Sequence, residues 1–237
     1  MRLLHIVATP RSHESNTIRV SNALIEELYL KYEDLTVRVL DLFKADLPAV
    51  AGENIESKYK LMTGQELDDH HKSSWDAIET NITRFLDSDI YLLTVPMWNF
   101  GIPYALKYYI DAIVQPGYLF RYNDRGIPEG LVTGKKMIIV TSSGGDYSPN
   151  GHLHSLDFVE PYLRTIFNFV GITDIHFINA QPMDISPGVR RAALLKAISE
   201  ARAFVISNHW DSHEVIEPVE FPEGVKPAPL EVSVLND

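Results

Sequence analysis

Three polar or glycine-containing stretches of the chain carry residue types that could bind a ligand, and each directly follows a short apolar run. They read ATPRSHESNT (8–17), PMWNFGIP (96–103) and TSSGGDYS (141–148). Hydroxyls at the start of a helix suit a phosphate, an aromatic loop suits a flat ring, and paired glycines leave backbone N–H groups accessible. Together they predict a site for a ligand that combines a phosphate with a polar-edged ring.

The first stretch places Ser15, Asn16 and Thr17 at the start of an expected helix. The free N–H groups of a first helical turn and the helix dipole both favour an anion, so no lysine is needed. The alternative is that Ser15 only caps the helix, which is a common role for serine. The stretch by itself leaves both interpretations open.

The second stretch mixes apolar Met97, Trp98 and Phe100 with polar Asn99, and Gly101 allows close backbone approach. Core packing is the usual role of such aromatic residues. The position after a strand and the polar group among apolar neighbours instead favour contact with a flat ring.

In the third stretch, Gly144 and Gly145 leave backbone N–H groups exposed and allow a ligand to approach without a Cβ in the way. The alternative is a plain turn. The coincidence of three such stretches at strand ends favours the ligand.

The elements that must position these stretches alternate between strand and helix. Short apolar runs predict strands, and 3.6-residue periodicity predicts helices between them. The predicted strands are 3–8, 36–40, 90–95, 137–141 and 175–178, and the predicted helices are 17–31, 73–86, 106–113 with Pro103 in the first turn, 156–170 and 189–209. This pattern predicts an α/β, flavodoxin-like, doubly wound five-stranded parallel sheet with helices on both faces, in which ligands bind at the carboxyl ends of the strands.

Two regions fall outside this pattern. Residues 48–72 are polar and are expected to form a long irregular excursion. Residues 210–237 are acidic and contain several prolines, so they predict an extended tail after a domain at 1–209. The tail is either a solvated terminus or an arm that packs on a partner subunit.

Composition excludes several classes of function. The net charge of -11 argues against nucleic-acid binding, and no stretch is long and apolar enough to cross a membrane, so a cytoplasmic location is expected. The chain has no cysteine, which excludes disulfides, thiolate nucleophiles and cysteine metal sites, and the histidine pairs lack the partners of a metal site. Any redox chemistry must therefore come from a bound cofactor.

Four further segments match a known family: VPMWNFGIPYALKYYID, FRYNDRGIPEGLVTGKK, TSSGG and PYLRTIFNFVGITDI. Over residues 1 to about 208 the chain resembles the FMN-dependent NADH-azoreductases, also called FMN-dependent NADH:quinone oxidoreductases, which are flavodoxin-like homodimers. The resemblance implies tightly but non-covalently bound FMN, with NADH or NADPH as electron donor.

The same resemblance implies roles for single residues. The FMN phosphate is assigned to Thr9, Ser15, Asn16 and Thr17, the ribityl chain and ring to Pro96, Met97, Trp98, Asn99 and Phe100, and the pyrimidine edge to Ser142, Ser143, Gly144 and Gly145. A backbone N–H near Asn99 or Phe100 is expected to face the flavin N5. Phe120, in the GYLFRY stretch, is expected to wall the substrate cavity of the neighbouring subunit, with core packing as the alternative.

The implied activity is two-electron transfer from NAD(P)H, through FMN, to a small quinone or azo compound, with the two substrates using one cavity in turn. The flavin carries the chemistry, so no catalytic side chain is expected. The alternatives are a flavodoxin-like electron carrier that binds FMN without turning over NAD(P)H, and a domain without cofactor.

Overall fold

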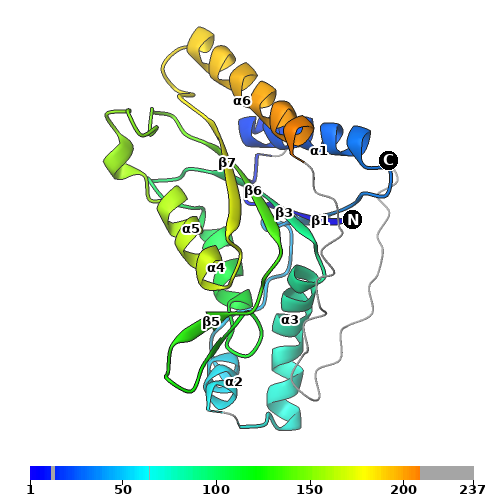
Figure 1. The fold of residues 1–237 in the computed structure, drawn as a ribbon. Helices are drawn as coiled ribbons and strands as arrows, with labels where there is room; N and C mark the ends of the chain where they lie inside the picture. The colour runs from blue at the N-terminus through cyan, green and yellow to red at the C-terminus, as the bar shows by residue number, and fades with distance from the viewer. Residues whose placement is uncertain (12–13, 64, 209–237) are drawn as a thin grey trace.

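The centre of the molecule is a five-stranded parallel sheet with the strand order β2-β1-β3-β6-β7 (Figure 1). The computed structural model describes residues 1–11, 14–63 and 65–208. The strands are β1 (Arg2–Val7), β2 (Thr36–Asp41), β3 (Ile90–Pro96), β6 (Lys136–Ser142) and β7 (Asp174–Ala180). The five predicted strands and the doubly wound parallel arrangement are thereby confirmed.

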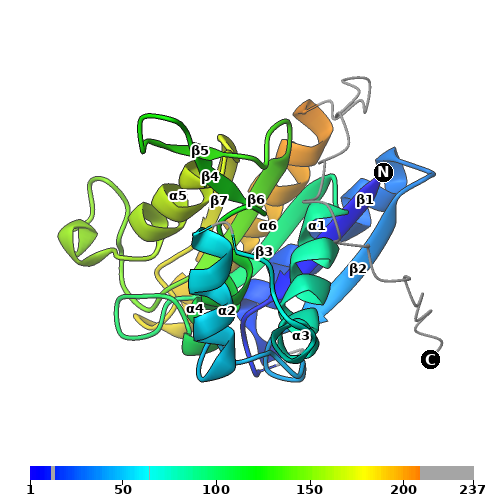
Figure 2. The same ribbon diagram turned by 90° about the horizontal axis from the view of Figure 1, so that it is seen from below.

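Helices cover both faces of the sheet. Two of them pack side by side on one face and three lie on the other, as Figures 1 and 2 show from two directions. The first face carries α1 (Asn16–Lys31) and α6 (Pro187–Ser207); the second carries α3 (Asp69–Leu86), α4 (Tyr104–Ile113) and α5 (Glu160–Phe169). Pro103 precedes α4 as its N-cap and does not stand inside the first turn as predicted.

The strands read as continuous apolar runs because both faces of the sheet are buried. Successive side chains of a strand point to opposite faces. In β6, Met137 and Ile139 join the core beneath α3, α4 and α5, whereas Ile138 and Val140 join the core beneath α1 and α6. A single run of sequence therefore serves two hydrophobic cores.

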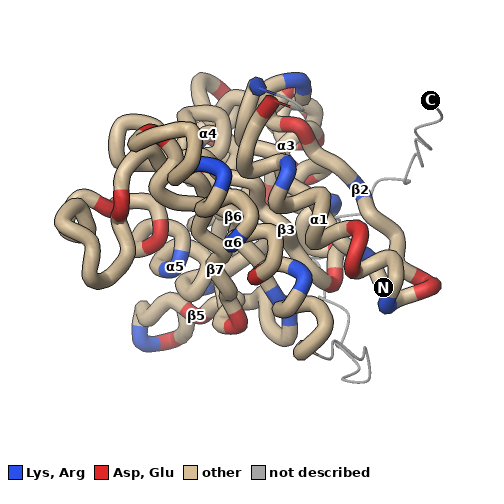
Figure 3. The backbone as a smooth tube through the Cα atoms, turned by 90° about the horizontal axis from the view of Figure 1, so that it is seen from above, with Lys and Arg blue, Asp and Glu red and all other residues tan. Residues whose placement is uncertain are grey.

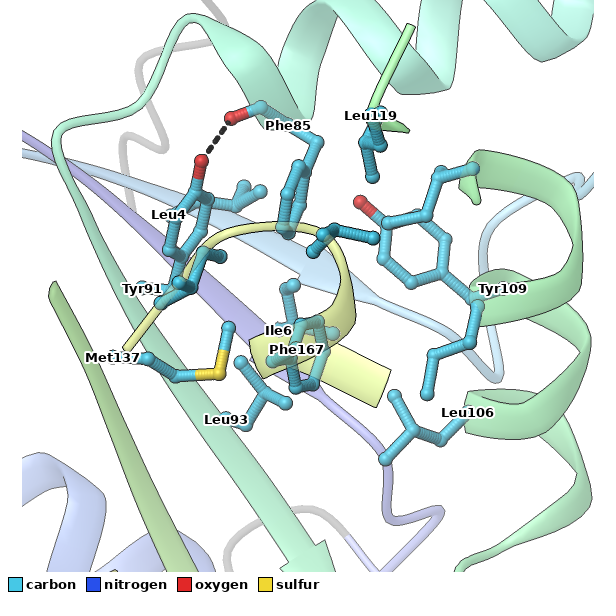
Figure 4. Close-up of a cluster of buried hydrophobic side chains, with 14 of the residues drawn as sticks. Leu4, Ile6, Phe85, Tyr91, Leu93, Leu106, Tyr109, Leu119, Met137 and Phe167 are labelled. Carbon is cyan, nitrogen blue, oxygen red and sulfur yellow. Dashed lines mark hydrogen bonds between the residues drawn. The ribbon is translucent and has the colours of Figure 1, made fainter. Parts of the chain in front are cut away.

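The larger core contains a stack of aromatic rings, shown in Figure 4. The rings of Phe85 and Tyr91 are parallel to within 15°, with centroids 4.2 Å apart, and Phe167 continues the stack. The buried Tyr91 hydroxyl donates a hydrogen bond of 2.9 Å to the Phe85 carbonyl. A large polar-tipped ring is accommodated there because its hydroxyl has a partner.

The prediction that residues 48–72 are irregular was wrong. This region contains α2 (Glu53–Met62), and α3 begins at Asp69, four residues before the predicted start. Helix α2 buries only Ser57, so it lacks the apolar stripe by which a helix is recognised in sequence. It is held by packing on α3 and by polar contacts such as His70 Nε2 to Glu53 Oε1 at 2.9 Å.

A short antiparallel hairpin, β4 (Phe120–Tyr122) and β5 (Pro128–Gly130), is a further element that the sequence pattern did not predict. Its turn is closed by Asn123, whose side-chain oxygen accepts from the N–H groups of Arg125 and Ile127. Gly126 has a φ of 71°, in the left-handed region that favours glycine. Three-residue strands are too short to show a periodic pattern.

The last two predicted helices are observed, whereas the predicted tail lies outside the described residues. The helix predicted at 156–170 is observed as α5 after a 3-10 helix, η2 (His154–Leu156), and α6 spans most of the predicted 189–209. Residue 209 and the predicted tail, 210–237, lie outside the described residues. Among the helices that the structure describes, none has the length and apolar character needed to cross a bilayer.

Lys31 ties the end of α1 to the end of α6. Its ammonium group donates to the carbonyl oxygens of Val205 at 2.7 Å and Asn208 at 2.5 Å. A cation at the carboxyl end of a helix satisfies free carbonyls and opposes the helix dipole. Lys31→Met is therefore expected to lower the free energy of unfolding by about 1.5 kcal/mol, measured by urea denaturation.

The control for this substitution is Lys44→Met. The Lys44 side chain is 74% exposed, and its ion-pair partner among the described residues is Asp41, at 3.0 Å. Exposed ion pairs contribute little, so this variant is expected to stay within about 0.5 kcal/mol of the wild type. Equal losses in the two variants would show that the Lys31 contacts contribute no more than a surface pair.

Candidate active site

The three stretches singled out in the sequence lie at one end of the sheet. They follow β1, β3 and β6, which are adjacent, and the registers Val7↔Thr94 and Pro96↔Ser142 bring the strand ends level. The chain turns from the β1–β2 side of the sheet to the β3–β6–β7 side at this point. In doubly wound sheets, this reversal opens a crevice in which ligands bind.

Buried hydroxyl groups line the start of α1. Thr9, Ser15 and Thr17 are 2%, 4% and 0% exposed. Ser15 is the N-cap, but its hydroxyl makes no hydrogen bond to the helix backbone and instead lies 2.7 Å from the Thr17 hydroxyl. The N–H groups of the first turn are thus not satisfied by the cap, as an anion site requires. Ser12 and His13 lie outside the described residues.

The loop after β3 is a tight two-residue turn. Trp98 N–H donates to Gly101 O at 2.9 Å, and Gly101 N–H donates to Trp98 O at 3.0 Å. Between them, Asn99 and Phe100 have φ values of 48° and 69°. Positive φ at both central residues defines a type I′ turn, which asparagine tolerates and phenylalanine adopts only under strain.

This turn leaves its own donors free. Within the part of the chain that the structure describes, the N–H groups of Asn99 and Phe100 meet no hydrogen-bond acceptor. The Phe100 carbonyl is held by the Phe158 N–H at 3.0 Å. Strained backbone with unpaired donors is typical of functional sites, because the surrounding fold maintains it for a ligand.

The strain at Phe100 is testable by comparing Phe100→Gly with Phe100→Ala. Both substitutions remove the ring, so their difference reports on the backbone alone. We expect the glycine variant to be more stable by about 1 kcal/mol in urea unfolding, because only alanine has a Cβ that clashes at positive φ. At a residue with negative φ the order is reversed, and an alanine variant that is equally or more stable would contradict the turn.

The side chains around this turn have mixed surroundings. Met97 packs on the larger core, and the Trp98 ring contacts Phe43 with centroids 5.7 Å apart. Phe43, from the loop after β2, also meets Tyr104 edge-on. Phe100 is 45% exposed. Local packing therefore accounts for the positions of Met97 and Trp98, while Phe100 faces solvent.

In the loop after β6, both glycines lie against protein side chains, which the prediction of an open approach for a ligand did not include. A Cβ on Gly144 would lie 2.5 Å from Asp184 Oδ2, and one on Gly145 would lie 2.4 Å from Leu153 Cδ1. Neither glycine has positive φ. Close approach of protein side chains therefore requires glycine here. The backbone N–H groups of both residues nonetheless lack acceptors among the described residues, so they are available to a ligand.

Ser142 and Ser143 act through different groups. The Ser142 carbonyl accepts from Met97 N–H at 2.8 Å, which joins the second and third loops. The Ser143 hydroxyl points inward, to Gly145 O and to Gln181 Oε1, both at 3.1 Å. Gln181 follows β7 and was not among the predicted site residues. A polar stretch after the fifth strand, AQPMD, was the signal available.

Phe120 lies elsewhere. It is 8% exposed and packs on Phe169, with ring centroids 4.7 Å apart. The β4–β5 hairpin packs against Val170 and Gly171, directly before β7, and so at the opposite end of the sheet from the three loops. Within one chain, Phe120 is not part of the site. In the same stretch, Tyr122 is 54% exposed.

Beneath the site, a chain of polar groups crosses the smaller core. His5 Nε2 lies 2.7 Å from Thr94 Oγ1, which lies 2.6 Å from Ser21 Oγ. His5 is 4% exposed, and burial lowers its pKa from 6.5 to about 4 because the charged imidazolium is poorly solvated there. The imidazole is neutral at pH 7 and orders β1, β3 and α1 relative to one another.

Figure 3 colours the backbone by residue type, and along it the Lys and Arg positions are interleaved with Asp and Glu positions. Within residues 1–11, 14–63 and 65–208, no group of three or more potential metal ligands gathers. The donors described at the three loops include backbone N–H groups and buried hydroxyls. This donor set fits a phosphate and the polar edge of a flat ring.

Comparisons with known proteins match most of the length of the chain. The model of the Flavodoxin_2 family, described as a flavodoxin-like fold, matches residues 1–205. A protein of Nitratidesulfovibrio vulgaris strain DP4 named FMN-dependent NADH:quinone oxidoreductase is 33% identical over 205 residues, covering 86% of this chain and 98% of the relative. FMN-dependent NADH:quinone oxidoreductase 2 of Xanthomonas axonopodis pv. citri is 36% identical, covering 83% and 90%.

Solved structures are similar as well. The azoreductase of Bacillus anthracis str. Sterne superposes with a TM-score of 0.78 at 25% identity, covering 86% of this chain and 98% of that one. An FMN-dependent NADH-azoreductase from Bacillus anthracis str. Ames Ancestor, solved in complex with FMN, gives a TM-score of 0.77 at 25% identity, covering 87% and 98%.

Proposed function

The chain belongs to the Flavodoxin_2 family, and from this premise we propose that it is an FMN-dependent oxidoreductase that passes two electrons from NADH to quinones and azo compounds. The observation that carries the proposal is that backbone N–H groups at three adjacent strand ends meet no acceptor among the described residues. The names of the relatives, FMN-dependent NADH:quinone oxidoreductase and azoreductase, support the same activity. They favour an enzyme over a flavodoxin-like electron carrier.

The proposed binding mode follows from the donors that each loop offers. The first turn of α1 and its hydroxyls would hold the phosphate, the strained turn would meet the ring, and the Gly144–Gly145 N–H groups would meet the pyrimidine edge. The residues proposed for these contacts are Thr9, Ser15, Asn16, Thr17, Pro96, Met97, Trp98, Asn99, Phe100, Ser142, Ser143, Gly144 and Gly145. Ser143 would contribute its backbone, because its hydroxyl is engaged inside the protein.

Bound FMN would supply the redox chemistry, and the chain would supply position and electrostatics. Fixed N–H groups at the ring edge stabilise negative charge there without having to reorient. Phe100 and the free N–H groups of its turn would orient the ring. With the turn held by two backbone hydrogen bonds, little entropy is lost when the ring binds.

We propose further that residues 1–209 form the FMN-binding domain and that two copies assemble into a homodimer. The GYLFRY stretch would then meet the cavity of the neighbouring copy, as proposed for Phe120. In this stretch the exposed ring is Tyr122, and Phe120 would act by supporting it, since their rings meet edge-on at 5.7 Å.

The experiment that tests the proposed function is an absorption spectrum of the purified protein after FMN is added and the excess removed. Retained flavin bands should bleach with NADH and return with benzoquinone. Two-substrate kinetics should give parallel lines, because one cavity serves both substrates in turn. Protein that retains no FMN would refute the site, and retained FMN that NADH does not bleach would instead favour an electron carrier.

A further inference from the structure

Two polar pairs stand side by side at the carboxyl ends of β6 and β7, on the face covered by α5. Thr141 Oγ1 donates to Asn179 Oδ1 at 2.6 Å, and one step further along, Ser143 Oγ donates to Gln181 Oε1 at 3.1 Å. Deeper in the same face, the corresponding position of β6 is apolar Ile139. The change from apolar to polar pairs therefore coincides with the end of the sheet that carries the site.

These side chains do not form a ligand pocket. They line a cavity of about 10 Å³ beside Met97 and Asp157. A volume of this size holds at most about one water molecule and excludes a ring or a phosphate. The polar groups must therefore serve as partners for one another and for the loops above them.

Gln181 is the partner that reaches the loop after β6. Its Oε1 accepts from the Ser143 hydroxyl and, at 3.0 Å, from the Tyr147 N–H. Ser143 and Tyr147 flank the Gly144–Asp146 segment, so a single oxygen atom clasps both ends of it. Because the Tyr147 N–H is a donor, the amide must present its oxygen and not its nitrogen to this loop.

Carbonyl groups of this segment have hydrogen-bond partners, whereas its N–H groups have none among the described residues. The carbonyls of Ser143 and Gly144 accept from Met183 N–H at 3.0 and 3.1 Å, and Asp184 N–H also donates to Gly144 O. The N–H groups of Gly144, Gly145 and Asp146 have no acceptor among the described residues. The loop after β7 therefore binds these two carbonyl groups, and the three successive N–H groups of residues 144–146 stay available.

We propose that Gln181 is a positioning residue that holds these free N–H groups in place for the edge of the bound ring. The inference rests on the proposed function. Two adjacent glycines are flexible, so without the clasp the segment would lose conformational entropy each time a ring bound. Gln181 touches no ligand atom itself and acts through the backbone of residues 143–147.

The test compares three variants by FMN affinity, measured by fluorescence titration. Gln181→Met keeps the size of the side chain but removes the acceptor of both the Ser143 hydroxyl and the Tyr147 N–H, and should raise the Kd for FMN at least about tenfold. Gln181→Glu retains an acceptor for both donors and should stay within about threefold of wild type. Asn179→Met, which breaks the lower pair only, is the matched control and should also stay within about threefold.

A second readout needs no cofactor. Hydrogen exchange of the Tyr147 amide in the FMN-free protein should be at least about tenfold faster in Gln181→Met than in wild type, and unchanged in Gln181→Glu. A folded Gln181→Met variant with wild-type affinity and exchange would overturn the inference, as would equal losses of affinity in Gln181→Met and Asn179→Met. Wild-type protein that binds no FMN would refute the proposed function instead, which the titration detects before any variant is compared.

Discussion

An aspartate in place of Asn16 is expected to weaken FMN binding by at least about 100-fold while slightly stabilising the FMN-free protein. Asn16 is the first residue of α1, and the first turn of this helix contains no acidic residue. Like charges about 5 Å apart repel by about 3 kcal/mol per unit charge at an effective dielectric constant of about 20. The phosphate carries more than one charge, so the total repulsion is large enough to raise the Kd more than about 100-fold.

The same substitution should raise the free energy of unfolding of the FMN-free protein by about 0.5 kcal/mol, since a carboxylate at a helix N-terminus opposes the helix dipole. A variant that gains stability but loses FMN affinity indicates that the start of α1 binds an anion. A helix start without a ligand would show the gain in stability alone. FMN affinity is measured by fluorescence titration, and stability by urea unfolding.

Gly188→Asp is the matched control for Asn16→Asp. Gly188 is in the first turn of α6, with no atom within 4 Å of the added Cβ, and α6 follows β7 at the far edge of the sheet. The control adds one negative charge to a helix N-terminus away from the predicted phosphate position, and should change FMN affinity less than about threefold. Comparable losses in the two variants would mean that net charge, and not a phosphate at α1, determines the affinity.

The second large effect is a loss of stability of about 2 kcal/mol between pH 7 and pH 5 that depends on His5. Burial lowers the pKa of His5 to about 4, whereas the unfolded chain has the ordinary value of 6.5. Between these values the unfolded state binds the proton and the native state does not, so the native state loses stability as pH falls. The loss begins near pH 6.5 and is complete near pH 4, where it reaches about 3 kcal/mol.

The measurement compares wild type with His5→Gln, both FMN-free, by urea unfolding at pH 7 and pH 5. Glutamine places an amide near the position of Nε2 and keeps a partner for the Thr94 hydroxyl, but it does not titrate. Taking the difference between the two proteins cancels the titration of every group that they share. This difference should change by about 2 kcal/mol in favour of the variant on going to pH 5. A difference independent of pH would mean that His5 accepts a proton in the native state.

The predictability of the site differs from loop to loop. Ser15, Asn16 and Thr17 were identified because a run of hydroxyl and amide residues at an expected helix start is visible in sequence. The unusual backbone of Asn99 and Phe100 was not, because phenylalanine rarely adopts positive φ and nothing local requires it. The turn is stabilised by contacts from distant parts of the chain, such as Phe158 N–H to Phe100 O.

Gln181 shows the same limit. Its partners Ser143 and Tyr147 lie 38 and 34 residues away in sequence, and only the parallel pairing of β6 with β7 brings them together. The polar stretch AQPMD marks this strand end in the sequence, but it does not show which residues the Gln181 side chain contacts. The role of Gly144 in binding a ligand stays a prediction, and the neighbour that requires a glycine there is Asp184.

The five strands and their parallel doubly wound arrangement were predictable from the sequence, because hydrophobic periodicity and connection lengths are local properties. The conformation of each loop, the helical state of α2 and the burial of Phe120 far from the loops within one chain were not. These features depend on contacts between residues that are distant in sequence, and such contacts cannot be predicted from a local sequence pattern. The free N–H groups of the site are the clearest case, since a donor is free only relative to everything folded around it.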